Sequence, residues 1–281
     1  MFYQMRFDPA KYADKMEFKF DPKLFWIKNL QQGSHIVFDT ASSNKTLAFD
    51  LKRGYEEHEE GLIKNNRPAS SFESYIAAFG DKPLLKVKYY KGNGNILTVP
   101  VKSDQSPEVV MIKNLSRETD WFYWQSALGY RAYMRLNNDQ EIIREDRIFA
   151  MKPPNKHYMT LGKEKIVNRK DDEYMMILFF RTKQFTSGTY IGKANIEVST
   201  KNKPNMLIIK RMDGIGTWRM FSTVFNSNDS LRVNSFGALT KKDDLLDVKL
   251  LNNGFSISSN APAINAEGSK YLYLCFTETS M

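Results

Sequence analysis

Cysteine and histidine are scarce in this chain of 281 residues. The single cysteine, Cys275, excludes an intramolecular disulfide and a metal site built only from cysteines. It lies in the apolar run 271–276, where a cysteine usually acts as a small buried hydrophobic residue. Three histidines offer little material for acid–base or metal chemistry. These shortages predict a protein that folds in a reducing cytoplasm and has no metal site and no cofactor.

Long hydrophobic runs are also missing. No stretch approaches the roughly 18 consecutive apolar residues that a membrane-spanning helix needs. Residues 1–8 reach an aspartate without an apolar segment, so no secretory signal is expected. The chain has no Gly-Lys-Ser/Thr phosphate loop, no His-Glu-x-x-His and no Gly-x-Ser-x-Gly. Gly92-Asn93-Gly94 is only a fragment of a dinucleotide loop, and we expect a turn there.

The charge is positive but mixed. The chain has 41 lysines and arginines against 32 acidic residues, a net charge of +9. The densest charged stretch, 163–173, carries both signs, whereas a groove that follows phosphates usually shows basic residues without interleaved acids. Nucleic acid is therefore an unexpected partner. We expect a solvated basic surface that contacts an acidic neighbour.

One sequence pattern occurs three times along the chain. Each copy has a proline, any residue, four apolar residues and a lysine, followed by Asn or Arg and another large apolar residue. Proline is tolerated at the start of a strand, and a continuous apolar run is typical of a strand buried on both faces. The three copies are Pro22–Lys28, Pro107–Lys113 and Pro204–Lys210.

A polar turn and an aromatic run follow each copy at nearly the same distance. The last aromatic residue lies ten residues after Lys28 and eleven after Lys113 and Lys210. This order and spacing predict a β-hairpin in every copy. The aromatic runs are His35–Phe38, Trp121–Trp124 and Trp218–Phe221.

Two further strands are expected in each copy. One is short, alternates apolar with other residues and ends at Asp or Asn, as a half-buried strand entering a turn does. The other is rich in aromatic residues and closes the copy. The short strands are 47–50, 134–137 and 231–234, and the closing strands are 75–79, 174–180 and 271–276. Between them, segments 51–60, 138–147 and 241–246 differ in sequence, which favours loops or short helical turns.

These elements predict an all-β protein of three tandem antiparallel modules, each a β-sandwich or jelly roll. The expected boundaries are 1–88 for an N-terminal arm plus the first module, 89–186 for the second and 187–281 for the third. The alternative is one domain of three sheets around a pseudo-threefold axis.

The lead-in, residues 1–20, matches nothing in the other copies. Its aromatic residues and methionine make it too apolar for a free tail, so we expect it to contact a neighbouring subunit. These residues are Phe2, Tyr3, Met5, Phe7, Tyr12 and Phe18.

The repeated pattern resembles a known module. The proline-to-lysine strand, the glycine turn, the aromatic return and the late Asn253-Gly254-Phe255 are similar to a tandem, concanavalin-like β-sandwich module of tailed-bacteriophage virion and tail-fibre-like structural proteins. The match is fullest over 203–278. The second copy lacks the Asn-Gly-Phe step, and the first matches mainly over 22–40.

The resemblance implies a non-enzymatic structural protein, made in the host cytoplasm and located in the virion. Its partners would be other virion proteins, in a homo-oligomer or a multi-copy array, and its part would be a tail- or fibre-associated adaptor or a capsid decoration. A receptor- or glycan-binding tail-fibre module is the alternative, and a glycan depolymerase is a third possibility. The family defines no catalytic or binding residues, so none is predicted, and no cofactor or metal ligand is assigned.

The histidines are weak candidates for chemistry. His35 aligns with Trp121 and Trp218, which indicates a packing position. His58 lies among four glutamates, which could bind a cation but more often form a solvated acidic loop or contact a basic neighbour. His157 follows a proline-rich turn and is expected in an exposed loop.

Paired carboxylates would be needed for glycoside hydrolysis. The acidic groups Asp171–Asp172, Asp243–Asp244 and Glu56–Glu60 all lie in polar loop contexts, with no indication that two carboxylates face each other across a cleft. Trp121 and Trp124 could form a stacking platform for a sugar. However, a spacing of three along a strand places them on opposite faces, so at least one is expected in the core.

Overall fold

The computed structural model describes residues 1–8, 18–42, 45–57, 63–64, 67–68, 72–242 and 244–278. Antiparallel strands make up most of the secondary structure, which confirms the all-β prediction. Within these ranges the helical elements are a single α-turn and three 3₁₀ turns: α1 (Lys165–Asn168), η1 (Thr40–Ser42), η2 (Ser126–Leu128) and η3 (Asp244–Leu246). None of the helices in the described part of the chain is long and apolar enough to cross a bilayer.

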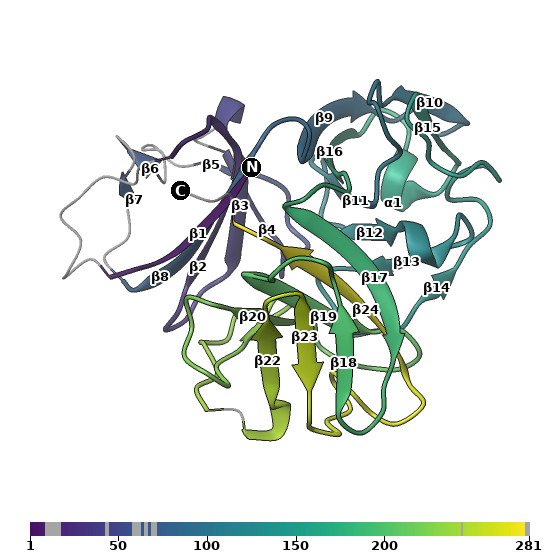
Figure 1. Cartoon of the computed structure of the whole chain (residues 1–281). Helices are drawn as coiled ribbons and strands as arrows, with labels where there is room; N and C mark the ends of the chain where they lie inside the picture. The colour runs from purple at the N-terminus through teal and green to yellow at the C-terminus, as the bar shows by residue number, and fades with distance from the viewer. Residues whose placement is uncertain are drawn as a thin grey trace.

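Three main sheets share one strand order, and Figure 1 shows them around a common centre. The first is β1 (Phe2–Phe7), β8 (Ser74–Gly80), β2 (Pro22–Asn29), β3 (His35–Asp39), β4 (Lys45–Ala48) and β5 (Glu56–Glu57). The second is β9 (Leu85–Lys91), β16 (Glu173–Phe179), β11 (Val109–Asn114), β12 (Phe122–Gln125), β13 (Ala132–Arg135) and β14 (Ile143–Arg144). The third is β17 (Phe185–Ile191), β24 (Lys270–Phe276), β19 (Met206–Arg211), β20 (Arg219–Ser222) and β21 (Leu231–Arg232).

Smaller sheets lie on the outer sides. The second repeat adds β10 (Leu97–Pro100) and β15 (Tyr158–Leu161), and the third adds β18 (Ile196–Ser199), β23 (Gly254–Ile257) and β22 (Val248–Leu251). Their apolar side chains pack with the outer faces of the main sheets in two separate clusters. Each of these repeats is therefore a two-layer sandwich. In the first repeat β6 (Ile63–Lys64) pairs with β7 (Arg67–Pro68).

The hairpin predicted from the repeated pattern is present three times in one register. Trp26 lies opposite Val37, Met111 opposite Tyr123, and Ile208 opposite Met220. This register confirms that the three lysines of the pattern occupy equivalent positions. The closing strands β8, β16 and β24 pair with the first hairpin strand in every repeat, as the aromatic pattern predicts.

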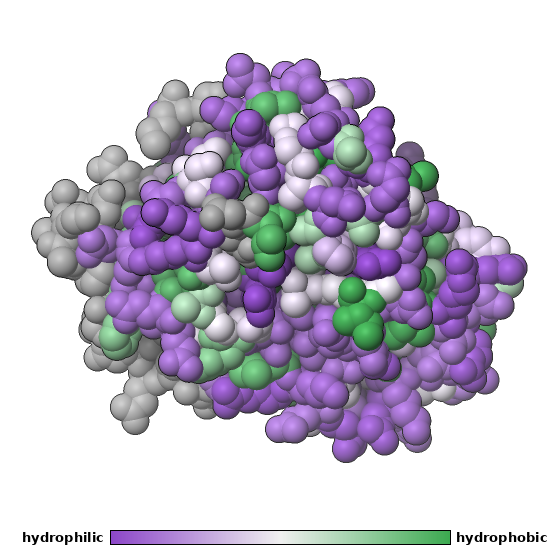
Figure 2. Space-filling view, turned by 90° about the horizontal axis from the view of Figure 1, so that it is seen from below, coloured by the Kyte–Doolittle hydropathy of each residue, from purple (hydrophilic) through white to green (hydrophobic). Residues whose placement is uncertain are grey.

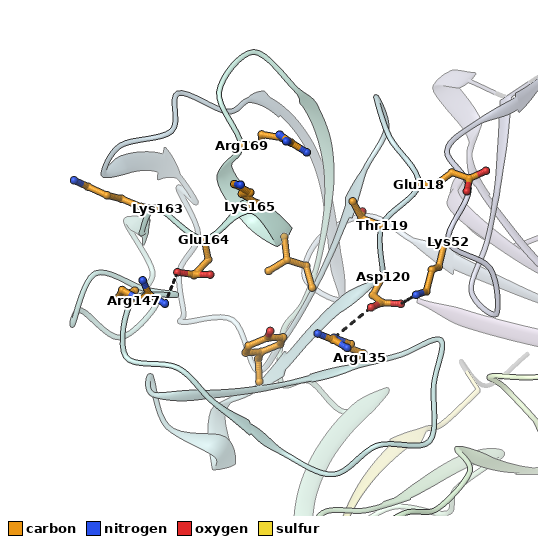
Figure 3. A pocket seen from close by; sticks show the side chains of 12 residues that line it. Lys52, Glu118, Thr119, Asp120, Arg135, Arg147, Lys163, Glu164, Lys165 and Arg169 are labelled. Carbon is orange, nitrogen blue, oxygen red and sulfur yellow. Dashed lines mark ion pairs between the residues drawn. The ribbon is translucent and has the colours of Figure 1, made fainter.

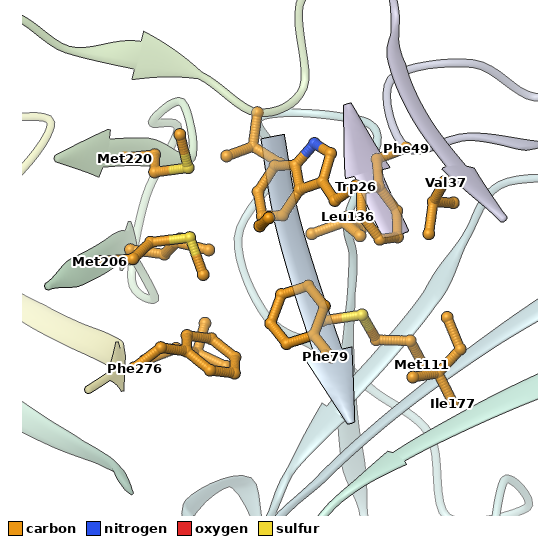
Figure 4. Close-up of a cluster of buried hydrophobic side chains, with 14 of the residues drawn as sticks. Trp26, Val37, Phe49, Phe79, Met111, Leu136, Ile177, Met206, Met220 and Phe276 are labelled. Atoms are coloured by element: carbon orange, nitrogen blue, oxygen red, sulfur yellow. The ribbon is translucent and has the colours of Figure 1, made fainter. Parts of the chain in front are cut away.

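The inner faces of the three main sheets meet in one hydrophobic core (Figure 4). Phe79, Phe179 and Phe276, one from each closing strand, surround the centre with ring centroids 5.3 to 5.6 Å apart. None of the three repeats buries this inner face alone, because each sheet is covered there by the other two. Of the two arrangements expected from the sequence, the pseudo-threefold one describes this centre, and the sandwich describes the outer sides of the second and third repeats.

The structure corrects two details of the expected boundaries. The predicted limits at 88/89 and 186/187 fall inside β9 and β17, which are the first strands of the second and third sheets. β1 is the counterpart of these strands, since it pairs with β8 in its own sheet and places Phe2 in the central core. Residues 2–7 are thus the first strand of the first repeat and not an unmatched arm. Phe18 also packs on its own repeat, against Tyr3 and Phe25, whereas Tyr12 lies outside the described residues.

Candidate functional site

The lysine of each repeated pattern is fully buried at a seam between two repeats. Lys113 Nζ donates to the carbonyl of Thr119 in its own repeat and, at 2.5 Å, to the carbonyl of Lys52 in the first repeat. The other two lysines repeat this arrangement in a cycle. Lys210 Nζ donates to Arg211 (2.9 Å) and to Asp139 of the second repeat (3.1 Å), and Lys28 Nζ donates to Gly33 and to Phe236 of the third repeat (3.3 Å).

Burial lowers the pKa of Lys28, Lys113 and Lys210 to about 8, with a partial opposing effect from nearby carboxylates. A lysine with a lowered pKa is the kind of group that acts as a nucleophile in enzymes. These three have no exposed surface, however, and their ammonium groups are bound to backbone carbonyls. Their role is to join the repeats.

A ring nitrogen makes a second contact at each seam. Trp121 Nε1 donates to the carbonyl of Ala48 at 2.7 Å, and Trp218 Nε1 donates to that of Arg135 at 3.2 Å. His35 holds the same position, with Nε2 3.0 Å from the carbonyl of Arg232. Since its Nδ1 accepts the indole N–H of Trp26, the hydrogen-bond network assigns the proton to Nε2. Burial, followed by the charge of Lys28, lowers the pKa of His35, so the ring is neutral and the predicted packing role is confirmed.

A third polar residue is repeated at each seam, after the buried lysine and the ring residue. It is the Asp or Asn that follows each short strand. Asp50, Asn137 and Asn234 accept the backbone N–H of the ring residue of their own repeat at 2.8 to 3.0 Å. From the sequence these residues were expected only to end a strand in a turn. Their occurrence at one position in all three copies was the available indication of a further role.

A charged groove of about 720 Å³ opens beside the seam between the first and second repeats (Figure 3). Most of its residues come from the second repeat, and Lys52 comes from the first. Six cationic and three acidic side chains contribute to it. The lining residues are Lys52, Glu118, Thr119, Asp120, Tyr133, Arg135, Arg147, Lys163, Glu164, Lys165, Ile166 and Arg169.

One side of the groove is held together by Asp120, and we call it the paired wall. The Asp120 carboxylate lies 3.5 Å from Lys52 Nζ and 3.3 Å from Arg135 Nε, and it accepts a 2.8 Å hydrogen bond from the side-chain amide of Asn137. Asn137 is the residue that binds the backbone of Trp121. The paired wall is thus tied directly to the repeated scaffold, and the Asp120 carboxylate offsets part of the positive charge of Lys52 and Arg135.

The opposite side, the cationic wall, consists of Lys163, Lys165 and Arg169. None of the three has an acidic side chain within 4 Å in the part of the chain that the structure describes. The neighbouring Glu164 pairs with Arg147 at 3.1 Å instead, as Figure 3 shows. The groove therefore has a net positive charge that is concentrated on one wall.

The groove residues differ between repeats, although the scaffold beneath them is the same. Because the three repeats share one strand register, each position of one repeat can be matched with its counterparts in the other two. This applies to the residue before His35, Trp121 or Trp218 and to the residues of the short strands. Asp120 corresponds to Ser34 and Thr217, and Tyr133 corresponds to Thr46 and Ser230. The scaffold does not require the carboxylate of Asp120, because the other two repeats form the same seam with a hydroxyl residue there, whereas Arg135 corresponds to Arg232 of the third repeat.

The DUF7483 family, described as a domain of unknown function, matches residues 71–280. This range covers most of the chain and includes the whole of both sandwich repeats together with β8. The chain belongs to this family. No curated protein matches it.

His157 is not among the residues that line the groove. His157 is exposed in a loop, as predicted. His58 and its neighbours Glu59 and Glu60 lie outside the described residues, while Glu56 pairs with Arg53. No group of three or more potential metal-ligating side chains occurs among the residues that the structure describes.

Asp171 and Asp172 have different surroundings and do not face each other. Asp172 is buried and accepts hydrogen bonds from Arg117 at 3.0 Å and from Asn114 at 2.8 Å. Asp171 is exposed and lies 3.7 Å from Lys91. The two neighbours therefore do not share a cleft. Asp243 lies outside the described residues.

Both tryptophans considered for sugar stacking are buried. Trp121 belongs to the central core and Trp124 to the outer core of the second repeat, so they lie on opposite faces as predicted. Neither offers a ring to solvent.

Gly92 is a turn residue, as expected from the sequence. A Cβ there would lie 2.1 Å from the carbonyl oxygen of Arg169, so the position requires glycine for a close backbone approach.

Proposed function

We propose that the protein is a non-enzymatic structural component of a tailed-phage virion that acts through contacts with other virion proteins. The observation that carries the proposal is how the three copies use their repeated polar groups. Lys113, Trp121 and Asn137, together with their counterparts, all bind backbone groups inside the molecule. What the repeats have in common is thus a rigid scaffold, which is the main requirement of a virion part. The resemblance of the repeated pattern to phage structural modules supports the same conclusion.

The surface favours partners that are attracted by charge. On the face shown in Figure 2, hydrophilic residues cover most of the area and hydrophobic residues form small separate groups. Combined with a net charge of +9, this surface suits binding to acidic protein surfaces in the assembled particle. The role within the particle would be a tail- or fibre-associated adaptor or a capsid decoration, present in several symmetric copies.

The test is to purify particles of the phage that encodes the protein and to quantify it against the major capsid protein by mass spectrometry. A fixed number of copies per particle is expected, at a symmetric position in a reconstruction of the virion. Abundant protein in infected cells with none in purified particles would refute the virion proposal.

A receptor-binding role is the second candidate, and the cationic wall is the observation that favours it. Lys163, Lys165 and Arg169 have no acidic partner among the described side chains, and an acidic glycan of the host surface would supply the negative charges to pair with them. Binding of the purified protein to acidic host glycans, lost in Lys163→Glu/Lys165→Glu, would favour this role over assembly.

A further inference from the structure

The cationic wall of the groove is presented by a rigid segment. Tyr174 Oη donates to the carbonyl of Lys165 and accepts the backbone N–H of Arg169, both at 2.8 Å. Asn168, which lies between Lys165 and Arg169 in the sequence, is fully buried and donates to the carbonyl of Gly162 at 2.7 Å. A ligand that pairs with this wall therefore does not have to order the backbone that carries it, which lowers the entropic cost of binding.

The charge pattern of the groove discriminates between anionic ligands. Glu118, Asp120 and Glu164 lie in the same groove as the cations. A nucleic acid has one phosphate at every step of its backbone, so its closely spaced charges would also meet these carboxylates. A peptide with separate carboxylate side chains can place its charges on the cationic wall and leave neutral atoms near the acids.

The groove is also large enough for such a segment. Its volume of about 720 Å³ lies within the range of ligand sites, roughly 300–1,000 Å³. Tyr133 and Ile166 add apolar surface between the charged walls. Carboxylates would pair with the lysines, and a guanidinium such as that of Arg169 can bind a carboxylate through two parallel hydrogen bonds.

We propose that this groove binds an acidic, glutamate- or aspartate-rich peptide segment of a partner protein. The inference deepens the proposed virion role and rests on it, because it specifies the partner chemistry through which the assembly contact is made. Lys163, Lys165 and Arg169 are the residues that determine the specificity. The paired wall at Asp120 limits the ligand to one with spaced charges.

The test uses the full-length protein and a fluorescein-labelled peptide of Glu-Gly-Gly repeats, in which neutral residues separate the carboxylates, in an anisotropy titration at low and at physiological salt. The Lys163→Glu/Lys165→Glu variant is compared with Lys193→Glu/Lys241→Glu, which reverses two exposed lysines of the third repeat and changes the net charge equally. We expect the first variant to lose at least about tenfold in affinity and the control to lose less than about threefold. Oligoglutamine should not bind. Thermal unfolding of both variants shows whether the fold is intact.

A charge-swap experiment tests the groove through a gain of binding, which a variant that is merely damaged would not show. Lys163→Glu/Lys165→Glu should gain affinity for oligolysine, whereas the control variant should gain less. Equal losses in both variants, or no binding by the wild type, would overturn the groove proposal. Tighter binding of single-stranded DNA than of the Glu-Gly-Gly peptide, lost in the same variant, would replace it with a nucleic-acid site. Each of these results concerns the groove alone, since the presence of the protein in particles is measured separately.

Discussion

The three buried lysines should make the free energy of unfolding depend on pH, and we work out the size of the effect for Lys113. Burial depresses the pKa of its amine in the folded state from 10.5 to about 8. In the unfolded chain the amine keeps its proton up to about pH 10.4. Between these two values the unfolded state binds more protons, so the free energy of unfolding rises with pH. Below about pH 8 both states are protonated and this contribution is constant.

The size of the effect follows from the same two values. A lysine that is neutral when folded and charged when unfolded contributes up to about 1.4 kcal/mol per pH unit. From pH 8 to pH 10 the total is about 2 to 3 kcal/mol for one lysine. Cys275 acts in the opposite direction, because burial raises the pKa of its thiol and stability is lost as the unfolded thiol ionises. A comparison with a lysine variant removes this common background.

The variant for this comparison is Lys113→Met, which keeps the apolar volume and removes the titrating group. The carbonyl of Lys52 retains a 2.8 Å hydrogen bond from the backbone N–H of Thr119, so it is not left without a partner. Urea unfolding at several pH values between 7 and 10 gives the two stability curves. Between pH 8 and pH 10 the wild type should gain about 2 to 3 kcal/mol relative to the variant. Parallel curves would refute the depressed pKa. Lys193→Met, at an exposed position, is the control and should follow the wild type.

Three further predictions concern the scaffold. Gly192→Ala should destabilise by about 1 to 3 kcal/mol or more in chemical denaturation, because the new Cβ would lie 2.1 Å from the carbonyl oxygen of Ala266; an unchanged midpoint would contradict the close approach. Phe179→Ala should lower the free energy of unfolding by about 3 to 5 kcal/mol and lower the unfolding midpoint of all three repeats together, since its ring lies where their sheets meet. Separate melting of one repeat would argue against a shared core. Arg117→Ala should cost about 1 to 2 kcal/mol in chemical denaturation at pH 7, because it removes the cation that pairs with the buried carboxylate of Asp172. An unchanged midpoint would contradict a stabilising ion pair.

The strands and hairpins of each repeat were predictable from the sequence, because they depend on local patterns. The run Pro107–Lys113 has the continuous apolar character of a strand buried on both faces, and the structure buries it between the central and outer cores. The nearly equal spacing to the aromatic run placed Trp121 and Trp218 at one position and His35 with them. Repetition made this comparison possible, since each copy served as a reference for the other two.

The groove was not predictable in the same way. Its lining brings Lys52 together with Asp120 and with the segment 163–169, which are far apart in the chain. In sequence the segment 163–173 is simply a mixed-charge stretch, and the charges of one sign that stay unpaired can be recognised only when their neighbours are known. The pairing of Glu164 with Arg147, which leaves Lys163 and Lys165 without an acidic partner, depends on tertiary contacts.

The sequence by itself determined the all-β character, the number of repeats and the register of their hairpins, because strand periodicity and turn residues act over a few positions. Only the tertiary structure decided that the three sheets share a core and that Lys28, Lys113 and Lys210 lie buried at the seams. A lysine in a sequence pattern is expected to be solvated until the backbone carbonyls that accept its hydrogen bonds are in place. For each lysine one of these carbonyls belongs to another repeat, and no local pattern contains it.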